Sequence, residues 1–139
     1  MYATSADEQS VRELISNWQE DNLQTRVAFI EAKELLESLD GCQLSFHGRP
    51  GITLSLRASY KKKLFAMVDI IDDEPASRWL SICFYGEMID DGQERGDFVP
   101  GGLLGSDACC FDYDSDDGVL LAYILERIRE AHDYCHSGR

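Results

Sequence analysis

The chain lacks any long run of apolar residues, and it has few basic residues for its size. No apolar stretch reaches the roughly 20 residues that a membrane-spanning helix requires. Residues 1–7 contain neither the basic region nor the apolar run of a secretion signal. We therefore expect a cytoplasmic protein without a membrane anchor.

Basic residues are scarce: the chain has 13 of them and 26 acidic residues, which gives a formal net charge of −13. The acids concentrate in residues 1–40 and 86–118, whereas residues 41–85 are slightly basic. A surface of this sign repels phosphate backbones, which argues against direct nucleic-acid binding. We expect the short basic run at residues 61–63 to be an exposed hairpin tip.

The chain also lacks a regular cysteine framework, because its five cysteines are odd in number and irregularly spaced. They are Cys42, Cys83, Cys109, Cys110 and Cys135. A chain of this length can fold without disulfides, so we expect reduced thiols. A zinc site would need Cys109 and Cys110 to converge near His132 and His136, but adjacent strand residues point to opposite faces. We expect no metal and no cofactor, with one cysteine packed in the core and the histidines at a frayed surface end.

Hydrophobic periodicity predicts an α+β fold. Helical spacing predicts N-terminal helices over about 5–40, either one or two, and a C-terminal helix over about 116–135. Alternating and continuous apolar runs predict a mostly antiparallel sheet of about five strands over about 42–113, formed by two hairpins plus a last strand. The helices should pack on one face of the sheet. We expect residues 1–139 to form a single acidic globular domain.

Local signals predict where the elements begin and turn. Ser5 has capping-box spacing with the acid three residues later, at the start of the first helix. Pro50 and Gly51 occupy the places that a type II turn requires between the first two strands. The nearly continuous apolar runs at 64–71 and 79–85 predict central strands that are covered on both faces.

Residues 86–118 hold ten of the 26 acids, one basic residue and seven of the 11 glycines. Such a segment cannot bury a core of its own, and long irregular segments are usually functional or mobile. We predict a Gly-rich acidic loop over 86–107. The alternating acids at 112–116 resemble the start of an EF-hand calcium loop, but Asp117 and Tyr123 stand where that loop requires Gly and Glu. A strand end followed by an acidic helix N-cap explains the pattern better.

Apolar residues inside the acidic loop can anchor it on the core or present a small contact to a partner. Together with two aromatic residues expected on the sheet, they form the predicted binding set. Its members are Trp79, Tyr85, Phe98, Val99, Leu103 and Leu104.

No motif in the chain specifies a reaction, so no catalytic residue is assigned and three function classes remain. The leading class is a non-enzymatic protein-interaction or binding module with a protein partner or a homodimer. The second is a nucleic-acid-mimicking inhibitor of a basic DNA-binding protein, in which carboxylates imitate phosphates. The third is a small ligand-binding protein or enzyme with a pocket between the 86–107 loop and the sheet, for which His47, Cys83 and Arg78 are candidates.

Overall fold

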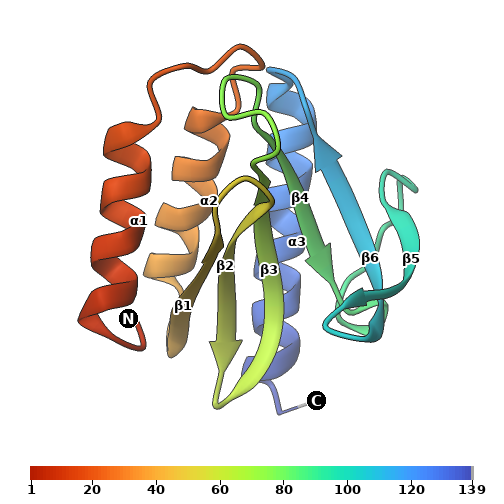
Figure 1. The fold of residues 1–139 in the computed structure, drawn as a ribbon. Coiled ribbons are helices and arrows are strands. Elements are labelled where there is room, and N and C mark those ends of the chain that lie inside the picture. The colour runs from red at the N-terminus through yellow and green to blue at the C-terminus, as the bar shows by residue number, and fades with distance from the viewer. Residues whose placement is uncertain (139) are drawn as a thin grey trace.

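In the computed structural model, which describes residues 1–138, three α-helices accompany a six-stranded antiparallel sheet (Figure 1). The helices are α1 (Ser5–Asn17), α2 (Arg26–Ser38) and α3 (Gly118–His136), with a short 3-10 helix η1 at Gly86–Met88. The strands are β1 (Cys42–Arg49), β2 (Thr53–Tyr60), β3 (Lys63–Ile71), β4 (Trp79–Phe84), β5 (Asp97–Leu103) and β6 (Ser106–Tyr113). The α+β class is confirmed, with six strands where about five were predicted.

The N-terminal helical region is two helices, which answers the question that the sequence left open. The N-cap of α1 is Thr4, whose Oγ1 accepts the N–H of Asp7 at 3.0 Å. The capping box predicted at Ser5 is therefore wrong by one position. The second helix begins at Arg26, and the carboxylate of Asp21 accepts the N–H groups of Thr25 at 3.0 Å and Arg26 at 3.3 Å. No helix of the described chain is long and apolar enough to cross a bilayer.

The strand order is β1-β2-β3-β4-β6-β5, so the two continuous apolar runs form the central strands β3 and β4, as predicted. The turn between β1 and β2 is type II in character, because Gly51 has a φ of +81° and the N–H of Ile52 donates to the carbonyl of Arg49. Lys61 and Lys62 form the predicted hairpin tip, each with positive φ. The segment that follows β4 passes β6 and returns as the outermost strand β5.

All three helices lie on one face of the sheet (Figure 1). The main core lies between these two layers and is made of alternate residues of the strands and the inward stripes of the helices. Four phenylalanines are among its largest fully buried side chains: Phe29, Phe65, Phe84 and Phe111. The predicted arrangement of helices on a single face is thereby confirmed.

The face of the sheet opposite the helices is covered only in part. Leu103 of β5 is fully buried there against Met67, Cys83, Ala108 and Cys110. These residues form a second, smaller cluster, and the Gly-rich segment supplies its cover. The Gly-rich segment does not extend over the rest of this face, at β1, β2 and β3; we call this part the open sheet face.

The expectation of reduced thiols is wrong for two of the five cysteines. Cys83 and Cys110 are register partners on β4 and β6 and form a disulfide. They are separated by 27 residues, and their pairing depends on the order of the strands, which the spacing of cysteines does not reveal. Cys109 packs against the main core and Cys110 against the small cluster, so the two point to opposite faces as predicted.

The expected frayed position of both histidines is wrong for His132. Its ring is buried, with Nε2 2.6 Å from the carbonyl oxygen of Asp40, and it packs edge-on against Tyr60 and Phe65. His136, one turn later, is exposed. α3 therefore keeps its inward stripe to its last turn, where a polar side chain is tolerated in the core because it is hydrogen-bonded.

Candidate functional site

Residues 86–107, which we call the acidic flap, are not the single loop that was predicted. They form η1, a loop and then β5, which pairs with β6 as an edge hairpin. The hairpin reverses at Leu104 and Gly105, whose φ angles of +51° and +92° suit a type I′ turn. Gly101 also has positive φ, and its N–H donates to Asp107 Oδ1 at 3.1 Å. The glycines therefore shape a defined hairpin.

Gly96 allows the acidic flap to lie close to β6. A Cβ atom at this position would come within 2.6 Å of Cys109 Sγ and 3.0 Å of a ring carbon of Phe111. No other residue fits without displacing these side chains. The backbone at Gly96 is thereby held against the thiol of Cys109.

Asp91 ties the loop of the flap to α3. Its carboxylate accepts the N–H groups of Gly96 at 2.9 Å and Arg95 at 3.0 Å, and the hydroxyl of Tyr123 at 2.5 Å. Burial alone would raise the pKa of Asp91, but these hydrogen bonds and the nearby Arg127 together lower that pKa below its ordinary value. Asp91 is therefore an ionised structural clamp at neutral pH.

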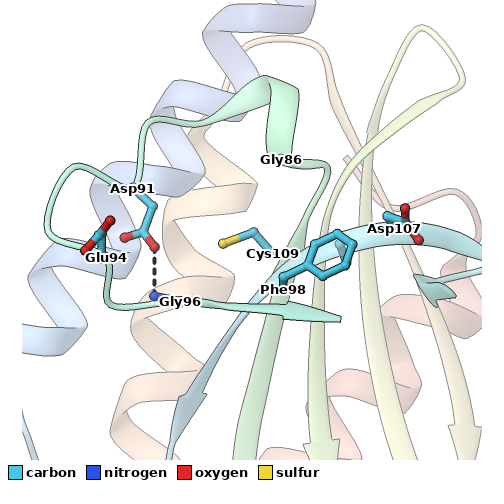
Figure 2. A pocket seen from close by; sticks show the side chains of 8 residues that line it. Gly86, Asp91, Glu94, Gly96, Phe98, Asp107 and Cys109 are labelled. Atoms are coloured by element: carbon cyan, nitrogen blue, oxygen red, sulfur yellow. Dashed lines mark hydrogen bonds between the residues drawn. The ribbon is translucent and has the colours of Figure 1, made fainter. Parts of the chain in front are cut away.

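A hollow of about 420 Å³ lies between the flap and the sheet (Figure 2). Its lining residues are Gly86, Asp91, Glu94, Gly96, Phe98, Asp107, Ala108 and Cys109. In Figure 2, Phe98 and Cys109 lie between Asp91 and Glu94 on one side and Asp107 on the other. Phe98 is 70% exposed, and no basic residue is among those that line the hollow. The result is an aromatic surface with an acidic rim.

The thiol in the hollow is poorly suited to nucleophilic chemistry. Burial, and then the negative charges of Asp91 and Asp97, raise the pKa of Cys109 above its ordinary value. The thiol therefore stays protonated at neutral pH, and the thiolate is the reactive form of cysteine. Within residues 1–138, no three His, Cys, Asp or Glu side chains are grouped so that they could hold a metal ion.

The structure separates the apolar residues of the flap that the sequence had grouped. Leu103 is fully buried and Val99 is packed beside it, so these two anchor the flap. Phe98 and Leu104 are 70% and 61% exposed, and only Phe98 lines the hollow. Of the predicted binding set, these two are the residues available to a partner on the flap.

The two aromatic residues predicted on the sheet lie outside the hollow. Trp79 and Tyr85 are both half-buried, and Tyr85 packs against both clusters of buried residues. The structure thus does not bring them together with Phe98. Their binding role stays a prediction.

The three polar residues considered for a pocket under the flap do not line it either. Cys83 is in the disulfide. Arg78 Nε lies 2.7 Å from Oδ1 of the buried Asp72, and its guanidinium packs over the ring of Trp18. His47 lies on the open sheet face, in a different hollow. Arg78 and Cys83 therefore have structural roles.

Sequence reasoning missed the residues that form the rim and floor of the hollow. Asp91, Asp107 and Cys109 were not placed in the predicted binding set, because their approach to Phe98 depends on the tertiary fold, including the β5–β6 register. One local signal was available. Gly96 directly precedes a strand, where a close backbone approach is a common reason for glycine.

No model of a known protein family matches the chain, and neither a curated protein nor a solved structure matches it. The function must therefore be inferred from the geometry and charge of the molecule.

Proposed function

We propose that this protein is a non-enzymatic interaction module that binds a lysine- or arginine-bearing segment of a partner protein at the hollow beside the acidic flap. The observation that carries the proposal is the exposed ring of Phe98 with carboxylates on both sides of it. Phe98 is exposed among negatively charged carboxylates, and none of its contacts gives it a role in stabilising the fold.

The chemistry of the hollow favours a long cationic side chain. Its methylene stem can pack on the exposed Phe98 while its charged end reaches Glu94 or Asp107. A cation over an aromatic face gains about 0.5–1 kcal/mol at an exposed site and more when water is excluded. The net charge of −13 would also speed the encounter with a basic partner.

The two alternative functions make different demands on the same residues. A nucleic-acid mimic depends on its carboxylates and has no need of Phe98. An enzyme of the thiol type would need a reactive thiolate, and the raised pKa of Cys109 opposes this. A homodimer stays a prediction, in which the partner segment comes from a second copy.

A cytoplasmic location also stays a prediction. The absence of a spanning helix among residues 1–138 is compatible with it. The Cys83–Cys110 disulfide opposes it, because such bonds are rare in reducing compartments.

The proposal is tested with peptides of mixed sequence that contain lysine or arginine, titrated into the protein and followed by fluorescence anisotropy at low and high salt. We expect binding that weakens with salt. Phe98→Ala should lower the affinity about fivefold or more, which corresponds to about 1 kcal/mol. Leu104→Ala is the matched control, because Leu104 is also largely exposed on the same hairpin but lies outside the hollow.

Two results would contradict the proposal. If no basic peptide binds at low salt, the acidic hollow is not a recognition site. If Glu94→Gln and Asp107→Asn abolish peptide binding but Phe98→Ala leaves it unchanged, the partner recognises the carboxylates alone. The nucleic-acid-mimic function would then describe the protein better.

A further inference from the structure

The face of the sheet opposite the helices carries a row of polar side chains across five strands, and its β1 to β3 part lies on the open sheet face. In register, His47 of β1 pairs with Ser55 of β2, Ser55 with Asp69 of β3, Asp69 with Ser81 of β4, and Ser81 with Asp112 of β6. The Cβ atoms of register partners on one face stand about 4.5–5.5 Å apart, so the row places these side chains next to one another. The alternation of polar and apolar residues along a strand makes its outward-facing positions usually polar. It does not require that five neighbouring strands all carry a polar residue at the same register position.

A second hollow, of about 200 Å³, lies over the β1 to β3 part of this row. Its lining residues are His47, Arg49, Thr53, Ser55, Arg57, Met67 and Asp69. This is the liquid volume of about six or seven water molecules. Arg49 and Arg57 flank the polar row, because one pairs with Thr53 and the other with Ser45, on opposite sides of the His47–Ser55 pair. The hollow thus has a guanidinium on each side.

Neither arginine forms an ion pair with a carboxylate of the described chain. Arg57 Nε donates to Ser55 Oγ at 3.2 Å, which holds its side chain toward the row. Among residues 1–138, no carboxylate oxygen lies within 4.0 Å of the charged nitrogens of Arg49 or Arg57, although acids outnumber bases twofold. Arginine pairs preferentially with carboxylates and phosphates. The pair is therefore free to hold an anionic group.

Asp69 lies in the same hollow. Whereas the arginines can bind an anion, its carboxylate needs a hydrogen-bond donor. Its Oδ1 is buried and has no hydrogen-bond partner in the described chain. Burial raises the pKa of Asp69, and a hydrogen bond from Ser55 and the charge of Arg57 offset this only in part. Buried acceptors are normally satisfied, so this oxygen calls for a donor from outside the chain. A cationic or hydroxyl donor on a ligand would supply it.

We propose that this hollow binds a small zwitterion of the amino-acid class, whose carboxylate is held by Arg49 and Arg57 and whose ammonium group donates to Asp69 Oδ1. The two arginines would bind the anionic group of the ligand, and the unpaired oxygen of Asp69 would accept a hydrogen bond from its ammonium group. The limited volume restricts the ligand to a few heavy atoms beyond these two groups. The site lies on the open sheet face, apart from the flap hollow, and does not depend on the function proposed there.

The test uses four probes in isothermal titration calorimetry: alanine, propionate, ethylamine and inorganic phosphate. Alanine should bind; propionate, which lacks the ammonium group, should bind at least tenfold more weakly, and ethylamine should not bind. A panel of the common amino acids then gives the preferred side chain.

Variants test which residues bind the carboxylate of the ligand and which bind its ammonium group. Arg57→Gln should weaken alanine binding tenfold or more, whereas Arg12→Gln, on the exposed surface of α1, should leave it unchanged. Asp69→Asn preserves the shape of the side chain and should bring the affinity for alanine down to that for propionate. Thermal melting of each variant verifies that it is folded.

Three results overturn the proposal: no amino acid binds, propionate or phosphate binds as tightly as alanine, or Asp69→Asn leaves the preference for alanine intact. The function proposed for the flap hollow is measured independently. Phe98→Ala should not change alanine binding, and Arg57→Gln should not weaken the binding of basic peptides. Failure at one site therefore leaves the other untouched.

Discussion

Leu103→Ala tests whether the acidic flap is anchored to the sheet. Leu103 is fully buried in the small cluster on the face opposite the helices, where it packs against Met67 and the Cys83–Cys110 disulfide. It is the only fully buried side chain of β5. If the flap is held by this contact, removing the side chain should destabilise the fold.

The expected magnitude follows from the carbons removed. Replacing leucine with alanine takes away three buried carbons, which at about 0.8 kcal/mol each gives about 2.4 kcal/mol. Core Leu→Ala changes cost about 2–5 kcal/mol, the higher values coming from cavities that do not collapse. The small cluster lies near a sheet edge, where β5 can relax inward. We therefore expect a loss of about 2–3 kcal/mol in the free energy of unfolding.

Urea unfolding followed by circular dichroism measures this loss. With a slope of about 1–3 kcal/mol per molar urea, a loss of about 2–3 kcal/mol should lower the midpoint by roughly 0.7–3 M. Leu104→Ala is the matched control, because it makes the same chemical change at the next residue, which is exposed. Its effect should stay within about 0.5 kcal/mol.

The anchoring argument is refuted if Leu103→Ala costs no more than Leu104→Ala. A smaller loss accompanied by faster amide hydrogen exchange at Phe98 and Val99 would show that the flap opens separately from the rest of the fold. In that case the anchor is real but local. Hydrogen exchange should therefore be measured on both variants.

Two further predictions concern the ends of α3 and of the flap loop. Asp117 caps α3 by accepting the N–H of Leu120 at 3.0 Å, so Asp117→Ala should cost about 1 kcal/mol in urea unfolding, and Asp114→Ala should cost much less. Because its pKa is lowered, Asp91 stabilises the fold above the unfolded value of about 3.8, and this contribution is lost as the pH falls through the folded pKa. Tyr123→Phe should raise the pKa of Asp91 in an NMR titration, and an unchanged pKa would contradict the role of that hydrogen bond.

Much of the fold follows from local pattern. The central strands were predicted because their apolar runs are continuous, and the turn at Pro50 and Gly51 because that pair fixes its own dihedral angles. An acidic N-cap for the last helix was predicted for the same reason, and the structure shows it at Asp117, whose hydrogen bond is to a residue three positions away. Signals of this kind act within one turn of helix or strand, where the sequence contains all the interacting groups.

β5 was missed because its own residues do not resemble a strand. It contains Pro100, Gly101 and Gly102, all of which disfavour strand interiors, and Phe98 faces solvent. Its strand conformation depends on pairing with β6 and on burying Leu103 across the sheet. A proline and two glycines are tolerated there because β5 is the edge strand and carries an irregularity between Val99 and Leu103.

The sites could not be predicted because their residues are joined only by tertiary register. Asp91 and Tyr123 are 32 residues apart in the chain and lie 2.5 Å apart in the structure. Likewise, Asp69 meets Ser55 only because β2 and β3 pair at a particular register, which shifts near Ala58. A shift by one residue would turn these side chains to the helix-covered face.

The glycines and acids of the flap have different causes. Gly96, Gly101 and Gly105 are required by close approach or positive φ, so the glycine content reflects a defined hairpin. Among the acids, Asp91 and Asp107 hold backbone N–H groups and are likewise explained by the fold. The Glu94 side chain makes no hydrogen bond or ion pair in the described chain, and Phe98 packs against neither hydrophobic cluster. A residue with a structural role is weak support for binding, so Phe98 and Glu94 carry most of the functional argument. Their variants should impair binding with little effect on stability.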